Sequence, residues 1–365
     1  MTTAPIAITN ARAITLSGPP NARRGREMSQ LSILPSADIL IAGSVIAAIG
    51  PAGSFPLPPN AHVLDAAGRV VLPGFVDCHT HACFAGSRID EWELKLRGVP
   101  YLDILKAGGG IMSTVRATRA ALGTELTALT NHRLAAMLEA GTTTAEVKSG
   151  YGLSPDAELG MLRAITACAG RIPALTPTAL LGHAIDGEHA PFVASTINET
   201  LPLITRHFPG ITVDAFCELA AWSLDDTRAL FLAARAAGHP LRLHADQFNS
   251  LGGVDLAISL GARSVDHLEA STESSLEALA ASSTIGVALP LCGLHLDGRF
   301  ARLRPLIDAG GAAAIATNFN PGSAPSFSIP FAIALAVRHC GLSPAEAITA
   351  STVNAAAVLD LFIAA

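Results

Sequence analysis

The sequence predicts an α/β fold: a (β/α)8 barrel of the TIM type with a small β-sandwich-like domain built from the N-terminal strands. Two observations favour this fold class. From about residue 70 onward, apolar strand-like segments alternate with Ala- and Leu-rich amphipathic segments. Polar residues that carry chemistry follow the strand-like segments, and this is the edge where such a barrel collects its active site.

The first part of the chain has a different pattern. Short apolar runs such as IAITNARAI and HVLDA are separated by Gly, Pro and Asn turns and show no helical period. We therefore expect a small β-sandwich domain over residues 1–70, with any contribution from residues 355–365. The barrel is expected over residues 71–354.

Eight segments of the barrel region are predicted to be its strands. The amphipathic segments between them mostly end in Gly, the favoured residue just past a helix C-terminus. A doubly wound sheet is the rival fold, but the first strand is not followed by GxGxxG. The predicted strands lie in residues 69–81, 142–150, 174–184, 211–218, 240–248, 262–269, 284–291 and 312–319.

Composition limits the classes of function. The chain has 365 residues, 50% of them hydrophobic, and a formal net charge of −6 without long charge runs. This balance argues against binding to nucleic acid or to a membrane surface. The N-terminus lacks signal-peptide features, and no apolar run is long enough to span a bilayer. Six scattered cysteines without a CxxC motif suggest reduced thiols and a cytoplasmic protein.

The strongest chemical signal is the HxH motif of His79 and His81 at the end of the first predicted barrel strand. Side chains two positions apart share one face of a strand, so the two imidazoles should converge. A pair of ordinary core or surface histidines is the alternative. This alternative is less favoured because His183, His244 and His267 also lie at predicted strand ends. His79, His81 and His244 together would bind zinc or ferrous iron and leave open positions.

Several longer motifs make the chain recognisable. They are PGFVDCHTHACFAGSR, GVPYLDILKAGGGIMSTVRATR, EVKSGYGL, LGHA, LHADQF with NSLGG, VDHLE and ATNFNPGS. With these motifs the chain resembles the amidohydrolase superfamily and, within it, the imidazolonepropionase family. The HxH pair is common to many amidohydrolases, whereas GGGIMSTVRATR, VKSGYGL and FNPGS are much more specific.

The resemblance implies an activity. It is the hydrolysis of the cyclic amide bond of 4-imidazolone-5-propanoate to N-formimidoyl-L-glutamate, a step of histidine degradation, by a cytoplasmic homodimer acting on a small molecule. One Zn²⁺ or iron ion per chain would be held by His79, His81 and His244, with Asn318 at the remaining ligand position. His267 matches a histidine near the reacting carbonyl, and Gln247 stands where relatives carry Glu or Gln. The positions matching substrate contacts are Arg88, Tyr101, Tyr151, His183, Asn320, Gly322 and Ser323.

Two departures from the family pattern leave alternatives open. The pattern ATDFNPG reads ATNFNPG here, so Asn318 replaces a carboxylate that would accept a proton. The chain also ends soon after Asn354, before the strands that complete the small domain in the family. The competing hypotheses are another cyclic-amide or deaminating amidohydrolase, and a catalytically impaired relative that still binds metal and ligand.

Overall fold

The computed structural model describes residues 4–99, 103–104, 107–121 and 123–361. The described chain divides into two compact units, and each is considered by itself. The smaller unit comprises residues 4–20 and 29–74, and the larger one residues 21–28 and 75–361. Within the described residues, every helix is too short or too polar to cross a lipid bilayer.

The smaller unit is one five-stranded sheet. Strand β1 (Ile6–Ile14) is its centre and pairs antiparallel with β2 (Ile33–Ala42), which pairs antiparallel with β3 (Val45–Pro51). Strands β4 (His62–Asp65) and β5 (Val70–Val71) pair with β1 in parallel. The expected sandwich is therefore present as a single layer in the described residues, because all of these strands join edge to edge.

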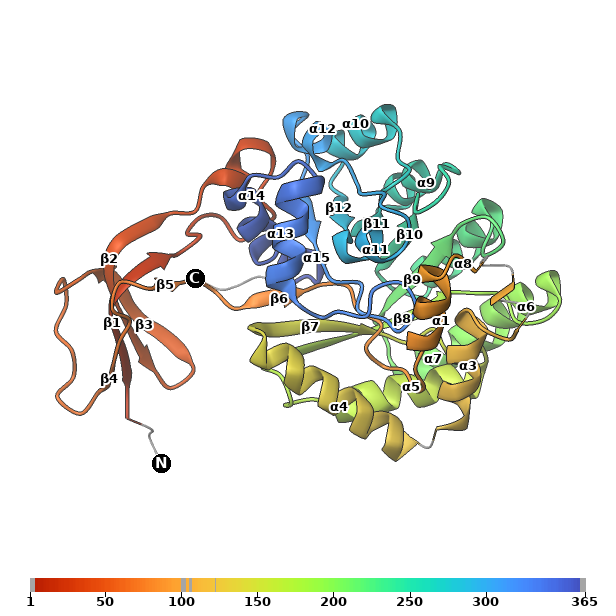
Figure 1. The fold of residues 1–365 in the computed structure, drawn as a ribbon, viewed down its shortest axis with the longest axis horizontal. Coiled ribbons are helices and arrows are strands. Elements are labelled where there is room, and N and C mark those ends of the chain that lie inside the picture. Colours follow the sequence, from red (N-terminus) through yellow and green to blue (C-terminus); the bar gives the residue numbers. More distant parts are fainter. Residues whose placement is uncertain (1–3, 100–102, 105–106, 122, 362–365) are drawn as a thin grey trace. The chain divides into compact units, whose positions relative to one another are not determined.

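The larger unit contains a sheet of eight parallel strands in sequence order, surrounded by helices (Figure 1). Each of the eight predicted strand segments contains one of them, so the predicted barrel is confirmed. The first predicted strand is divided by Pro73 and Gly74 into β5 and β6, because proline cannot donate to a sheet and glycine weakens a strand. The barrel strands are β6 (Phe75–Asp77), β7 (Thr142–Lys148), β8 (Ala174–Gly182), β9 (Thr212–Cys217), β10 (Leu241–Ala245), β11 (Ser264–His267), β12 (Ile285–Ala288) and β13 (Ala313–Ile315).

Helices connect successive strands and cover the outside of the barrel (Figure 1). Several begin with a serine that caps the first turn, as Ser223 and Ser343 do with reciprocal capping boxes. The helices are η1 (Gly25–Ser29), α1 (Ile89–Leu96), α3 (Ile111–Ala120), α4 (Gly123–Glu139), α5 (Pro155–Ala167), α6 (His189–Ser195), η2 (Thr196–Thr200), α7 (Leu201–His207), α8 (Leu224–Ala236), α9 (Gly253–Leu260), α10 (Glu273–Ala281), α11 (Pro290–His295), α12 (Leu303–Asp308), α13 (Ile329–His339), α14 (Pro344–Ala350) and α15 (Val353–Val358).

The barrel closes where the chain leaves β6 and β13. The Asn318 N–H donates to the His79 carbonyl at 3.0 Å, and the His81 N–H donates to the Phe319 carbonyl at 2.9 Å. Two residues before His79, the buried Asp77 carboxylate accepts the Thr317 N–H at 3.1 Å and the Thr317 hydroxyl at 2.5 Å. The seam between the first and last strands thus lies directly beside the HxH motif.

The strands have an apolar outer face and a polar inner face. Val147, Val213 and Leu243 point to the buried core under the helices. Alternate residues on the same strands, such as Lys148 and Asp214, are equally buried but charged. Because side chains alternate along a strand, this pattern assigns the charged residues to the barrel interior.

Candidate metal centre

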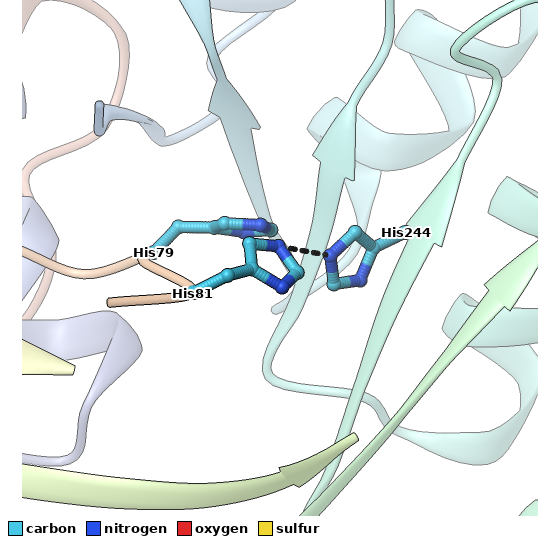
Figure 2. A group of neighbouring side chains, drawn as sticks. All are labelled: His79, His81 and His244. Carbon is cyan, nitrogen blue, oxygen red and sulfur yellow. Dashed lines mark hydrogen bonds between the residues drawn. The ribbon is translucent and has the colours of Figure 1, made fainter. Parts of the chain in front are cut away.

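His79, His81 and His244 converge at the carboxyl end of the barrel strands (Figure 2). His79 and His81 follow β6, and His244 lies in β10. One ring nitrogen of each lies within 4.8 Å of the others, and the His81 and His244 Nε2 atoms are 3.4 Å apart. All three side chains are buried. The structure therefore brings together the three histidines that the sequence predicted as metal ligands.

Two of the rings are held by carboxylates. His79 Nδ1 lies 2.6 Å from Asp266 Oδ2, and His244 Nδ1 lies 3.0 Å from Asp214 Oδ1. A proton on each Nδ1 leaves the Nε2 lone pair directed at the centre, and the buried His79 Nε2 has no hydrogen-bond partner. Carboxylates behind imidazoles are the usual supports of metal-binding histidines.

Burial also sets the charge of the three rings. It lowers the pKa of His79 and of His81 well below the ordinary value, and the pKa of His244 is lowered too although Asp214 opposes the shift. The rings are neutral at pH 7, as metal ligands must be. An orphaned buried nitrogen and a neutral, convergent donor set both fit a divalent transition metal.

A continuous series of buried ion pairs and hydrogen bonds connects His79 with His244 through the barrel interior. Carboxylates and cations alternate along it, and each successive pair lies between 2.5 and 3.0 Å apart. The members come from four strands of the barrel, β7, β9, β10 and β11, and from the segment after β6. In order they are His244, Asp214, Lys148, Glu146, Arg242, Asp266 and His79.

Sequence reasoning missed most of this network. It gave no role to Asp214, Arg242 or Asp266. The available signal was a charged residue inside an otherwise apolar strand, as in TVDAFC and LRLHA. A buried charge needs a partner of opposite charge, so each of these residues predicts that another charged residue is buried beside it. We name the set Asp214, Lys148, Glu146, Arg242 and Asp266 the barrel ion network.

Asn318 follows β13, and its backbone N–H donates to the carbonyl of His79 at 3.0 Å. It is buried, and its backbone has the left-handed φ of 55°, which asparagine and aspartate tolerate better than most residues. Among the described residues, no carboxylate joins the three histidines in their group of ligand atoms within 4.8 Å of one another. Strand ends at Asp246 and His267 also have positive φ, 57° and 94°. Such strain concentrates at functional sites.

His183 and Tyr151 form an aromatic wall beside the centre. The His183 ring stacks on His81 at a centroid distance of 5.1 Å, and Tyr151 lies 5.1 Å from His183. His183 Nδ1 lies 2.8 Å from the Gly150 carbonyl, so it carries the proton and Nε2 has a free lone pair. Burial lowers the pKa of His183 to about 3, so the ring is neutral.

Arg88 and the loop after β13 also come together. A Cβ on Gly322 would collide with Arg88 Nη1, so any larger residue would displace the guanidinium from its present position. Glu91 holds the other edge of the guanidinium, at 3.0 Å from Nε and 2.9 Å from Nη2. A pocket of about 150 Å³ borders Arg88 and Pro321.

Asn320 and Ser323 have a different part in this loop. The Asn320 side-chain oxygen accepts the N–H groups of Gly322 and Ser323, each at 2.8 Å. Its amide nitrogen donates to the Asn318 carbonyl at 2.6 Å and to Ser323 Oγ at 2.8 Å. Asn320 therefore shapes the turn that presents Gly322 to Arg88. Tyr101 lies outside the described residues.

His267 ends β11, and its ring centroid lies 5.6 Å from that of His244. Burial acts to lower its pKa, but the nearby Glu269 carboxylate and Cys292 outweigh it and raise the pKa to about 10. The ring is thus protonated at neutral pH and can donate to a developing oxyanion. Gln247 Nε2 donates to Cys292 Sγ at 3.3 Å.

Comparison with known proteins decides the family. Residues 70–363 match the model of the amidohydrolase family. The chain is 48% identical to the imidazolonepropionase of Deinococcus radiodurans, over 94% of this chain and 85% of the relative. It is 45% identical to that of Chloroflexus aggregans, over 94% of this chain and 84% of the relative. The chain belongs to the amidohydrolase family, in its imidazolonepropionase group.

Solved amidohydrolase-type structures share the fold at lower identity. The chain is similar to 5-methylcytosine deaminase from Klebsiella pneumoniae, with a TM-score of 0.71 and 17% identity, over 98% of this chain and 87% of that one. It is similar to N-isopropylammelide isopropylaminohydrolase from Burkholderia multivorans, with a TM-score of 0.67 and 20% identity, over 98% and 87%. At these identities the likeness shows the barrel architecture alone. Amidohydrolases are metal-dependent, and the three-histidine cluster is the candidate metal site of this one.

Proposed function

We propose that this chain hydrolyses the cyclic amide of 4-imidazolone-5-propanoate and releases N-formimidoyl-L-glutamate in histidine degradation. The observation that carries the proposal is the convergence of three neutral, buried histidines in a chain whose relatives at 45–48% identity are imidazolonepropionases. The proximity of Arg88 to Gly322 supports an anionic substrate, because a guanidinium can hold a carboxylate with two donors.

His79, His81 and His244 would hold one zinc or iron ion per chain. Such an ion supplies Lewis-acid polarisation and a water whose pKa is lowered to about 7. The remaining tasks belong to the side chains of the chain itself. Binding the tail of the substrate falls to Arg88 and to the loop that Asn320 shapes around Gly322 and Ser323.

The neighbouring side chains divide the other tasks by their charge. The bare Nε2 of neutral His183 accepts an N–H of the substrate ring, and Tyr151 and its neighbours exclude water from that side. Protonated His267 donates to the oxygen of the carbonyl under attack, and it is the proton source for the leaving nitrogen. Gln247, an amide without a titratable proton, orients the groups around His267.

A second candidate is a metal- and ligand-binding relative with little turnover. Asn318 favours it, because an amide cannot take the proton that a carboxylate takes in this position. Another cyclic-amide or deaminating activity on the same barrel is the third candidate. The specific motifs around Arg88 and Tyr151 favour imidazolone propionate over other rings.

The test is metal content and hydrolysis of imidazolone propionate on one purified sample. About one metal per chain together with turnover supports the proposal. Bound metal without turnover favours the second candidate, and turnover of a hydantoin or nucleobase in preference to the imidazolone favours the third. The homodimer and the cytoplasmic location belong to the same proposal, as do the domain limits at residues 1–70 and 71–354. Sedimentation of the purified chain tests the dimer.

A further inference from the structure

A second cluster of metal-binding side chains lies next to the first. His267, Glu269 and Cys292 each offer a ligand atom within 4.8 Å of the others. His267 ends β11, Glu269 follows it in the next turn, and Cys292 lies in the short helix α11. Imidazole, carboxylate and thiolate are the donor types that zinc prefers. The three-histidine centre contains no sulfur, so the two sites differ in chemistry.

The cluster is buried and incompletely satisfied. The side chains of His267 and Glu269 are 3% and 5% exposed, and Cys292 is 1% exposed. Glu269 Oε2 is a buried oxygen without a hydrogen-bond partner. His267 Nδ1 lies 3.3 Å from the carboxylate oxygens, longer than the usual charge-assisted hydrogen bond. A buried carboxylate oxygen with no hydrogen bond and a long ion pair to His267 can accept a metal cation among these ligand atoms.

A small cavity borders the cluster. It has a volume of about 10 Å³ and is lined by Glu269, Cys292, Gln247 and Arg299, among others. This is roughly the space of one water molecule, or of one ion. The cation in the lining, Arg299, is held by Asp297 at 2.6 and 2.9 Å, which compensates its charge. Gln247 Nε2 donates to Cys292 Sγ at 3.3 Å, so this sulfur acts as a hydrogen-bond acceptor.

We propose that His267, Glu269 and Cys292 form a second, thiolate-containing site for a thiophilic divalent cation such as Zn²⁺ or Cd²⁺. Binding releases the protons of the Cys292 thiol and of the His267 ring to solvent, and the metal takes the lone pairs that these atoms then expose. An occupied site removes His267 as a proton donor. Excess metal is therefore inhibitory, and this consequence rests on the proposed function, whereas the binding itself does not.

The binding test needs no substrate. The full chain is freed of metal by a chelator and titrated with Cd²⁺ while thiolate-to-metal charge transfer is followed in the near ultraviolet. We expect one equivalent without a charge-transfer band, at the three histidines, and a second equivalent with one. Cys292→Ser should lose the band and keep the first equivalent, which shows that it folds. Cys168→Ser, at another buried cysteine between α4 and α5, should keep both.

Two further arms complete the test. Glu269→Gln should weaken the second equivalent while Cys292 and the band remain at saturation. In the assay, excess Zn²⁺ should lower the rate by about 10²-fold, the usual loss when an acid is removed, and Cys292→Ser should resist it. A band that persists in Cys292→Ser, or binding that stops at one equivalent, overturns the proposal. A chain that binds two equivalents but never hydrolyses imidazolone propionate refutes only the proposed function.

Discussion

Lys148 Nζ donates to Asp214 Oδ2 at 2.8 Å, and the other carboxylate oxygen, Oδ1, lies 3.0 Å from His244 Nδ1. Lys148 is fully buried and also contacts Glu146 at 2.6 Å. Lys148 thus positions the Asp214 carboxylate, and this carboxylate orients the ring of His244. The orientation of the His244 ring in the candidate metal centre therefore depends on the barrel ion network.

Lys148→Met tests this dependence. It leaves two buried carboxylates without their shared cation, which should cost about 3–5 kcal/mol of unfolding free energy. Metal affinity, measured by competition with a chromophoric chelator, should fall by about 10- to 100-fold because the His244 support is released. Arg97→Met, which removes an exposed ion pair with Glu93, should change neither quantity. Equal metal affinity in Lys148→Met and the parent would show that the network serves stability alone.

Asn318→Asp should raise turnover. The left-handed backbone at this position accepts aspartate as readily as asparagine, and the new carboxylate can take a proton. We expect a gain in kcat of about 10²–10⁴-fold and tighter metal binding. Asn318→Ala serves as the control and should show neither gain. If Asn318→Asp is no faster than the parent, another group already accepts the proton.

Arg88→Met should raise KM by about 10- to 100-fold, with a smaller change in kcat. The reason is that the guanidinium binds the substrate tail and not the reacting ring. This range in KM corresponds to the binding free energy of one or two hydrogen bonds to a charged group. Gly322→Ala should act in the same direction, because its Cβ collides with Arg88 Nη1. A substrate analogue without the carboxylate provides the control. Arg88→Met should leave its KM unchanged, and an equal rise for both compounds contradicts the assignment.

Acidification should loosen α1. His295 of α11 stacks on Trp92 of α1 at a centroid distance of 5.3 Å, and burial beside Lys95 lowers its pKa to about 4. Since the ordinary pKa is 6.5, the packed state resists protonation. Its stabilising contribution is complete above pH 6.5 and is lost as the pH falls toward 4.

Hydrogen exchange in Ile89–Leu96, corrected for the intrinsic rate, measures this effect. Protection should fall between pH 6.5 and 4 in the parent chain. His295→Phe keeps a stacked ring without a titratable group, so its protection should stay level. The same pH dependence in both chains would assign the effect to other groups.

Metal removal should lower Tm. A ligand that binds the folded chain alone stabilises it by about 4 kcal/mol at a free concentration of 1,000 times Kd. Calorimetry before and after treatment with a chelator gives the change. His79→Ala, which removes a ligand, should have a Tm that the chelator does not alter. A chelator-sensitive Tm in that variant would locate the stabilising ion elsewhere.

The strands and the convergence of His79, His81 and His244 could be predicted from the sequence because each depends on local pattern. Alternating apolar segments indicate barrel strands, and the barrel itself places strand ends together. The partners of Lys148 and Arg242 could not be predicted, because they lie on other strands and depend on the register between them. The hydrogen bonds that Asn320 makes within its own turn could not be predicted either, because they depend on the conformation of the loop. The single-layer sheet of the small unit likewise depends on long-range pairing.

The seam of the barrel has a consequence for the order of assembly. Asp77 and Thr317, which join the first strand to the last, are 240 residues apart in the sequence. During synthesis on the ribosome, one edge of β6 stays unpaired until nearly all of the barrel has been made. Contacts of such long range form late and slow the folding rate. His79, His81 and His244 have all been synthesised well before that moment, so an ion bound by them can hold the first strand near the fifth while the last one is still missing.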